Sequence, residues 1–173
     1  MLGSIWLTTD NKEIEKIILS LSKKENTISF KAHVTLVNGI QSNTDVNLKM
    51  FIERFKKIKN ILLNKKIVLK PKIIKTGDSF SQSIFITFFE NPDILKLREN
   101  IIDRLIKPNN YQFNKNFYPH LSLIYKIFSN KEYRQNITKQ IKIPSALEFN
   151  DLKLILEEKP IEKNEDILKW KIF

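Results

Sequence analysis

Hydrophobic and polar positions along the chain form patterns that predict a first series of four elements. These are a strand over 4–8, a helix over 12–22, a strand over 32–37 and a helix over 45–59. Thr9 or Asp10 is expected to cap the first helix and Asp45 the second, and Asn38-Gly39 is expected to close the second strand. Both helices have apolar residues three or four positions apart, so each should bury one face.

A second series begins with a predicted hairpin. Its elements are strands over 66–75 and 83–88 around a turn at 76–79, a helix opened by Asn91-Pro92 and ended by Pro108, a strand over 120–125, a helix over 131–138, and strands over 147–156 and 167–173. Strand, helix, histidine-bearing strand and helix thus occur twice. Connections of this kind predict an α+β fold with largely antiparallel sheets. The sequence argues against a Rossmann or P-loop fold, because the three glycines form neither glycine-rich motif.

The length of 173 residues fits one domain, and we expect a single bilobal unit over residues 1–173. Hydrophobic residues make up 42% of the chain, enough for a sizeable core, and the lack of cysteine excludes disulfides and thiolate nucleophiles. No apolar run approaches the roughly 18 residues that span a bilayer, and the N-terminal pattern is not that of a signal peptide. We therefore expect no membrane partner and a cytoplasmic or nuclear location, and we expect a monomer.

The formal net charge of +11 would attract polyanions such as nucleic acid. The cationic residues are nearly all lysines and are dispersed, whereas phosphate-reading sites favour clustered arginines. The abundant Lys, Asn and Ile are all encoded by A/T-rich codons, so base composition could explain much of the positive charge. A generally cationic surface is therefore favoured over a dedicated nucleic-acid groove, and RNA or oligonucleotide ends stay open as partners.

Two short motifs repeat around the only two histidines. Each has the order histidine, apolar residue, hydroxyl residue, apolar residue: His33-Val34-Thr35-Leu36 and His120-Leu121-Ser122-Leu123. Along a strand, residues two apart project from the same face. Each motif therefore presents an imidazole beside a hydroxyl and turns its two apolar side chains into the core.

Two imidazoles that face each other across a cleft can act as general base and general acid on opposite sides of a phosphorus atom, because histidine titrates near neutral pH. The hydroxyls can donate hydrogen bonds to phosphoryl oxygens as their charge grows. This chemistry needs no metal and no other cofactor. Two alternatives carry less weight. The histidines could merely satisfy hydrogen bonds in their strands, or a carboxylate could complete a metal site, although no His-x-His or His-Glu spacing is present.

The paired motifs resemble those of the 2H phosphoesterase superfamily, and within it the chain is similar to the cyclic phosphodiesterase family of plants and yeast. Further similarity lies in segments spread over almost the whole chain: Ser4-Ile5-Trp6-Leu7, Phe30, Phe117-Tyr118-Pro119, Ser122-Leu123-Ile124-Tyr125 and Trp170. Two positions depart from the family pattern. Ala32 stands in place of a proline before the first histidine, and Lys126 in place of a frequent glycine or acidic residue.

The resemblance implies a bilobal α+β fold with pseudo-twofold symmetry, in which two antiparallel sheets face a central cleft and helices lie outside. It implies metal-independent hydrolysis of a ribose cyclic phosphate. The substrate is either a 2′,3′-cyclic nucleotide, opened to a nucleoside 2′-phosphate, or an ADP-ribose cyclic phosphate. The resemblance makes His120 the base and His33 the acid, although the reverse is chemically permissible. Thr35 and Ser122 would hold the phosphoryl oxygens.

The resemblance also places two aromatic residues, Trp6 and Tyr125, in the substrate site. The pattern around Trp6 fits a core position in its strand equally well. Tyr125 lies at an odd offset from His120, so strict alternation turns it away from the catalytic face, and only a bend after Ser122 would bring it back. Two rival functions stay open. One is a sibling enzyme that acts on oligonucleotides, as a 2′,5′-phosphodiesterase, an RNA 3′-end exonuclease or a 2′,5′ RNA ligase. The other is an inactive RNA-binding module that uses the same cleft.

Overall fold

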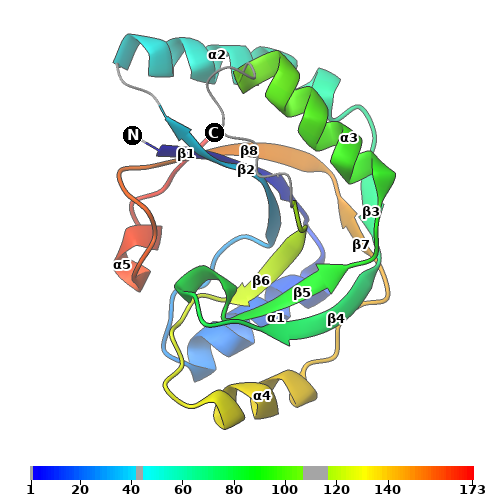
Figure 1. Ribbon diagram of the computed structural model, residues 1–173, viewed down its shortest axis with the longest axis vertical. Helices are drawn as coiled ribbons and strands as arrows, with labels where there is room; N and C mark the ends of the chain where they lie inside the picture. Colours follow the sequence, from blue (N-terminus) through cyan, green and yellow to red (C-terminus); the bar gives the residue numbers. More distant parts are fainter. Residues whose placement is uncertain (1, 42–44, 107–116) are drawn as a thin grey trace.

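Two antiparallel sheets form the centre of the computed structural model, which describes residues 2–41, 45–106 and 117–173 (Figure 1). The first sheet has the strand order β2-β1-β8-β9, the second has the order β4-β5-β6, and β3 pairs with β7 between them. The strands are β1 (Leu2–Thr8), β2 (His33–Gln41), β3 (Ile67–Leu69), β4 (Pro71–Thr76), β5 (Ile84–Phe88), β6 (His120–Ile124), β7 (Leu147–Phe149), β8 (Asp151–Glu157) and β9 (Lys171–Ile172). Every pairing of these strands is antiparallel, so the predicted α+β class is confirmed.

Helices cover the outer faces of both sheets (Figure 1). They are α1 (Lys12–Lys24), α2 (Asp45–Leu62), α3 (Pro92–Ile101), α4 (Lys131–Gln140) and α5 (Asn164–Ile167), with a 3₁₀ turn η1 (Phe80–Gln82) and a π-helical turn η2 (Ile102–Ile106). Helices α2 and α3 lie over the first sheet, and α1 and α4 over the second. The series β1-α1-β2-α2 thus repeats as β5-α3-β6-α4, and in each the first helix crosses to the other sheet. The expected cap by the Asp45 side chain and helix end at Pro108 lie outside the described residues.

Alternation along the two histidine strands decides which side chains enter the core. Val34 and Leu36 of β2 are buried, and so are Leu121 and Leu123 of β6, as their motifs predict. Burying each such side chain stabilises the fold by about 1.5 to 3 kcal/mol. The apolar half of each motif therefore anchors its strand and leaves the polar half for chemistry.

The N-cap of α1 is Asn11, so the expected caps Thr9 and Asp10 are wrong. The Asn11 side chain accepts two hydrogen bonds from backbone N–H groups of the first helical turn. The Asp10 carboxylate is instead paired with the Lys31 ammonium at 2.6 Å. The Thr9 hydroxyl accepts a hydrogen bond from the Asn11 backbone N–H and so helps to position the cap.

Strand β2 does not end before Asn38-Gly39 but runs through it, which corrects the predicted strand over 32–37. The register with β1 shifts across this pair, as in a β-bulge. Gly39 has a φ of 71°, in the left-handed region that glycine adopts without strain. The Asn-Gly signal therefore marks a bulge within the strand and not its end.

Two long predicted strands are each divided into two short ones. Lys70 separates β3 from β4, and Asn150 separates β7 from β8. Both breaks lie where the chain leaves the β3–β7 pair for one of the two sheets. Pro71 suits this corner, because proline lacks the N–H that a central strand needs. The strand predicted over 167–173 is also wrong at its start, since α5 ends there and only β9 is extended.

Candidate active site

His33 is the first residue of β2 and is almost fully buried. Its Nδ1–H donates a hydrogen bond of 2.6 Å to the Lys31 carbonyl, so Nε2 of the neutral ring carries no proton. The imidazole lies flat on the Trp6 indole, with ring centroids 3.5 Å apart and an interplanar angle of 5°. Burial, opposed by the Lys31 carbonyl and aided by repulsion from His120, lowers the pKa of His33 to about 3. His33 is therefore neutral at physiological pH.

His120 begins β6 in the second sheet and is more exposed than His33. Its Nδ1–H donates a hydrogen bond of 3.0 Å to the Tyr118 carbonyl, and its Nε2 accepts one of 3.1 Å from the Gln82 side-chain amide. Burial lowers the pKa of His120, and the Tyr118 carbonyl opposes this shift. Both histidines thus have Nδ1 held by a backbone carbonyl and a lone pair on Nε2.

The two hydroxyl residues differ in how they are held. Thr35 lines a cavity, and its hydroxyl makes no hydrogen bond to any residue that the structure describes. Ser122 is buried, and its hydroxyl donates a hydrogen bond of 2.6 Å to the Ser81 carbonyl. The Thr35 hydroxyl is therefore available to a ligand, whereas the Ser122 hydroxyl must turn from Ser81 before it can donate to one.

A bulge in β6 brings Tyr125 to the side of the histidines. The register with β5 skips one residue of β6 after Ser122, so the alternation of side chains changes there. The Tyr125 hydroxyl lies 3.3 Å from the His33 Nε2, to which it donates a hydrogen bond. Burial raises the pKa of Tyr125, the negative charge of Glu157 raises it further, and the nearby Ser122 hydroxyl opposes them. The Tyr125 hydroxyl therefore keeps its proton, and its hydrogen bond to His33 connects the first motif to the residues that directly follow the second.

Trp6 is both a buried core residue and a cavity-lining residue, which are the two positions that its sequence context allows. Its side chain is only 3% exposed, as in a core residue, yet it also lines the cavity. Besides stacking on His33, its ring meets the edge of Trp170, with centroids 4.8 Å apart and an interplanar angle of 81°. Thr35 lies directly opposite Trp6 in the β1–β2 register. The indole is therefore held rigidly beside both polar residues of the first motif.

The cavity beside these groups has a volume of about 330 Å³. Its lining includes Trp6, Thr35, Tyr125 and Glu157. His33 lies behind Trp6 and Tyr125 and contacts both. Glu157 is the last residue of β8 and is not among the site residues that the sequence predicts. In the sequence it is a carboxylate directly after the apolar run Leu154-Ile155-Leu156, which is too common a pattern to single it out. The pairing of β8 with β1, which brings this strand beside Trp6, could not be inferred from the sequence.

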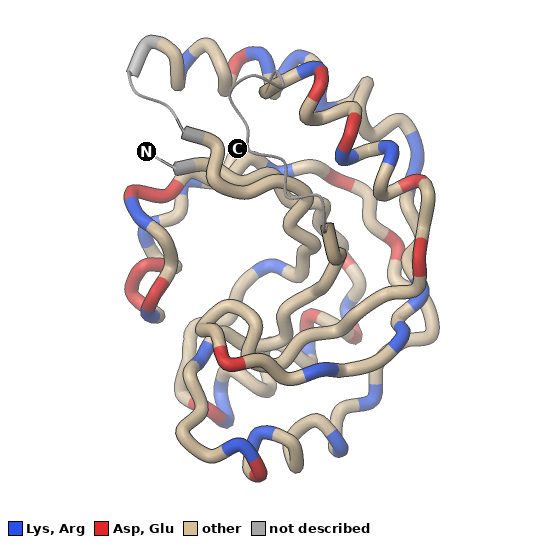
Figure 2. Tube along the Cα trace, viewed as in Figure 1, with Lys and Arg blue, Asp and Glu red and all other residues tan. Residues whose placement is uncertain are grey.

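Charged side chains are excluded from the strands nearest the two histidines. Strands β1, β2, β5 and β6 contain no Lys, Arg, Asp or Glu. Figure 2 shows the cations spread over the helices and loops of both halves, in line with the dispersed pattern in the sequence. Within the described ranges, no three candidate metal ligands lie close together, and no helix is long and apolar enough to cross a membrane.

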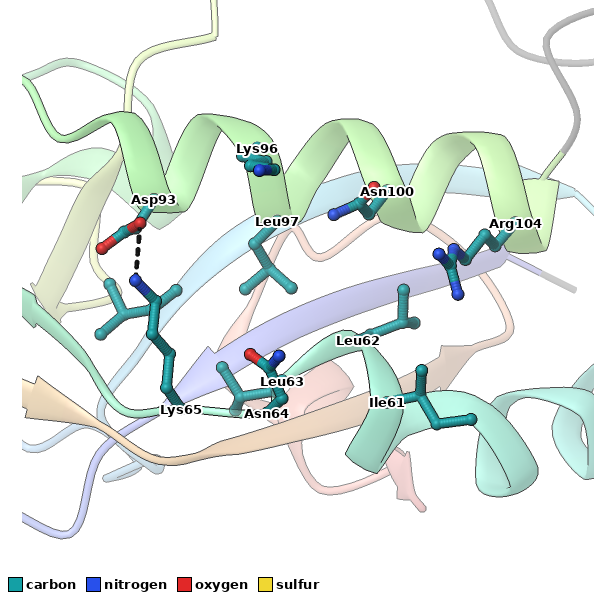
Figure 3. Close-up of a pocket in the computed structure, with 11 residues that line it drawn as sticks. Ile61, Leu62, Leu63, Asn64, Lys65, Asp93, Lys96, Leu97, Asn100 and Arg104 are labelled. Carbon is teal, nitrogen blue, oxygen red and sulfur yellow. Dashed lines mark hydrogen bonds and ion pairs between the residues drawn. The ribbon is translucent and has the colours of Figure 1, made fainter.

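Another cavity, of about 550 Å³, lies between the end of α2 and helix α3 (Figure 3). Leu62 and Leu97 contribute apolar lining, Arg104 lies at one end, and an ion pair of 2.9 Å joins Lys65 to Asp93 at the other. None of the predicted site residues lines this cavity. Of the predicted site residues, Trp6, Thr35 and Tyr125 line the smaller cavity, whereas His33, His120 and Ser122 are not among its lining residues.

Comparisons with known proteins agree with this architecture. A family model described as cyclic phosphodiesterase-like protein matches residues 1–170. The chain superposes on E. coli LigT in complex with 3′-AMP with a TM-score of 0.59 at 12% identity, covering 100% of this chain and 96% of LigT. It superposes on Kluyveromyces marxianus Usb1 with a TM-score of 0.53 at 11% identity, covering 88% and 92%. LigT and Usb1 have the 2H phosphoesterase fold, so the expected fold is confirmed. A sequence comparison with curated proteins gives no significant match.

Proposed function

Because the chain belongs to the cyclic phosphodiesterase-like family, we propose that it hydrolyses a ribose cyclic phosphate by a two-histidine mechanism that needs no metal ion. The observation that carries the proposal is the matched pair His33 and His120, each with Nδ1–H on a backbone carbonyl and a lone pair on Nε2. Structures of the same fold in complex with 3′-AMP and with uridine monophosphate support a nucleotide as the ligand. The substrate is a 2′,3′-cyclic nucleotide, opened to a nucleoside 2′-phosphate, or an ADP-ribose cyclic phosphate.

In this reaction a water oxygen bonds to phosphorus, and the bond from phosphorus to one ribose oxygen breaks. The base removes a proton from the water, and the acid gives a proton to the leaving ribose oxygen. Thr35 and Ser122 donate hydrogen bonds to the phosphoryl oxygens, whose negative charge grows in the transition state. Burial lowers the pKa of both imidazoles, and the anionic phosphate of a bound substrate opposes this shift. The pair His33 and His120 therefore gains a proton more readily when substrate is bound.

We assign His120 as the base and His33 as the acid. His120 is the more exposed imidazole, so a water molecule reaches its Nε2 once the Gln82 amide moves. His33 is enclosed by Trp6 and Tyr125, which suits the group that protonates the leaving oxygen out of contact with solvent. For this step Tyr125 must release the His33 Nε2. The neutral ring must also first take up on Nε2 the proton that it donates, and the anionic phosphate favours this uptake.

The test is hydrolysis of adenosine 2′,3′-cyclic phosphate by purified protein in the presence of EDTA. We expect full activity in EDTA, losses of about 100-fold to 10,000-fold for His33→Ala and His120→Ala, and losses of about 10-fold to 1,000-fold for Thr35→Ala and Ser122→Ala. Ser129→Ala, which removes an exposed hydroxyl, is the matched control and should keep wild-type activity. Circular dichroism would establish that each variant is folded.

The same assay separates the rival functions. Inactivation by EDTA that a divalent metal reverses would overturn the two-histidine mechanism. Faster turnover of 2′,5′-oligoadenylate or 3′-tailed RNA than of the mononucleotide, lost at high salt, would favour the enzyme that acts on oligonucleotides. RNA binding without hydrolysis of any of these substrates would favour the inactive binding module.

A further inference from the structure

Glu157 gives the cavity beside the histidines an unusual electrostatic character. It is the one acidic residue among the described residues of the cavity lining, and no Lys or Arg is among them. The neighbouring strands β1 and β2 carry no charged residue either. In a chain with a net charge of +11, the cavity next to a phosphate-handling site therefore contains a carboxylate and no cation.

Glu157 has no structural partner that explains its position. Its half-buried side chain makes no hydrogen bond or ion pair with any described residue. By contrast, the buried Glu25 carboxylate is bound by Lys126 and Tyr133, and the buried Asp166 carboxylate is bound by Lys159 and two backbone N–H groups. Burial accordingly raises the pKa of Glu157, with no compensating contact. A carboxylate that is partly desolvated and unpaired favours a ligand that brings hydrogen-bond donors.

The charge of Glu157 also acts on the catalytic groups. It raises the pKa of the Tyr125 hydroxyl, which is hydrogen-bonded to His33. Glu157 is therefore near enough to influence a nucleotide whose phosphate lies between the two histidines. The part of that nucleotide that extends into the cavity meets a hydrogen-bond acceptor and a negative charge.

We propose that Glu157 is a specificity-determining residue, which accepts hydrogen bonds from the hydroxyl or amino groups of a bound nucleoside and rejects ligands that carry a second phosphate. The kind of ligand rests on the proposed function. The favoured substrate is then a nucleoside cyclic phosphate with a free 5′-hydroxyl. Of the two substrates proposed above, Glu157 disfavours ADP-ribose cyclic phosphate, because that molecule also carries a diphosphate. A negative charge placed against a second negative charge discriminates against 5′-phosphorylated and oligonucleotide substrates without any steric obstacle.

The experiment compares adenosine 2′,3′-cyclic phosphate with its 5′-phosphorylated form in wild type, Glu157→Gln and Glu158→Gln. Glu158 is the matched control, because it is the adjacent, exposed carboxylate and does not line the cavity. We expect wild type and Glu158→Gln to favour the 5′-hydroxyl form by about tenfold or more in kcat/KM, from charge repulsion at cavity distances. Glu157→Gln should reduce this preference to about threefold or less.

Calorimetric binding of adenosine 2′-phosphate and adenosine 2′,5′-bisphosphate provides a second measurement that needs no turnover. Tighter binding of adenosine 2′-phosphate than of the bisphosphate, lost in Glu157→Gln and kept in Glu158→Gln, would support the inference. If the protein showed this preference but no hydrolysis, the inference would stand and only the proposed function would fail. Hydrolysis with equal preference in wild type and Glu157→Gln would overturn the inference and leave the proposed function intact. Failure of wild type to bind either nucleotide would also overturn the inference.

Discussion

Because His33 is buried and neutral, we expect the free energy of unfolding to depend on pH, whether or not the protein is catalytically active. The imidazole is neutral in the folded protein, with its pKa lowered to about 3, whereas in the unfolded chain it has its ordinary value of 6.5. Between these two values the unfolded state binds a proton that the folded state does not bind. Stability from this group is therefore complete above pH 6.5 and is lost as the pH falls toward 3.

The size of the effect follows from the two pKa values. Each pH unit inside the window lowers the free energy of unfolding by about 1.4 kcal/mol. From pH 7 to pH 5 the loss due to His33 is about 2 kcal/mol, a large part of the 5 to 15 kcal/mol typical of a domain. In His33→Gln this contribution is absent, because glutamine does not titrate.

Urea unfolding followed by circular dichroism at pH 7 and pH 5 would measure this contribution. We expect the difference in unfolding free energy between wild type and His33→Gln to change by about 2 kcal/mol between the two pH values. The control Thr35→Val alters the next outward-facing residue of β2, does not titrate, and should show the same difference from wild type at both pH values. A His33→Gln difference that is constant to within about 0.5 kcal/mol would refute the buried, neutral state of His33.

Two further predictions concern catalysis. In the proposed mechanism His33 and His120 together hold one proton in the active form, and burial places the pKa values of both below 6.5. We therefore expect kcat/KM to fall about tenfold per unit as the pH rises from 7 to 9, and a rise or a plateau there would contradict this proton count. Benzene-1,2-diyl cyclic phosphate has a better leaving group than ribose, so it should restore much of the activity of His33→Ala but not of His120→Ala; the opposite rescue would exchange the acid and the base.

Local patterns predict most of the elements of this fold but not the positions where pairing between distant strands bends the chain. The alternation in the two histidine motifs correctly predicts that Val34, Leu36, Leu121 and Leu123 are buried. The Asn38-Gly39 bulge depends on pairing with β1, and the break at Asn150 depends on the position of β3; both partners lie outside the local segment. A signal confined to a few adjacent residues contains no information about such partners.

The same distinction applies to the candidate site. The side-by-side placement of His33 and Thr35 follows from strand periodicity alone. The position of Tyr125 depends on one extra residue in β6, and that of Glu157 on the register between β8 and β1, so neither follows from periodicity. Only the family resemblance indicated Tyr125, and nothing in the sequence singled out Glu157.

Strand β1 pairs with β2 on one side and with β8, over residues 151–157, on the other. During synthesis at about 5 to 20 residues per second, roughly 150 residues separate the end of β1 from the end of β8, so one edge of β1 waits about 8 to 30 seconds for its partner. A ribosome-bound chain halted before residue 151 already contains both histidine motifs but lacks the strand that completes the sheet beneath Trp6. Messages truncated in this last stretch therefore yield products that retain both histidine motifs and expose an unpaired, aggregation-prone edge.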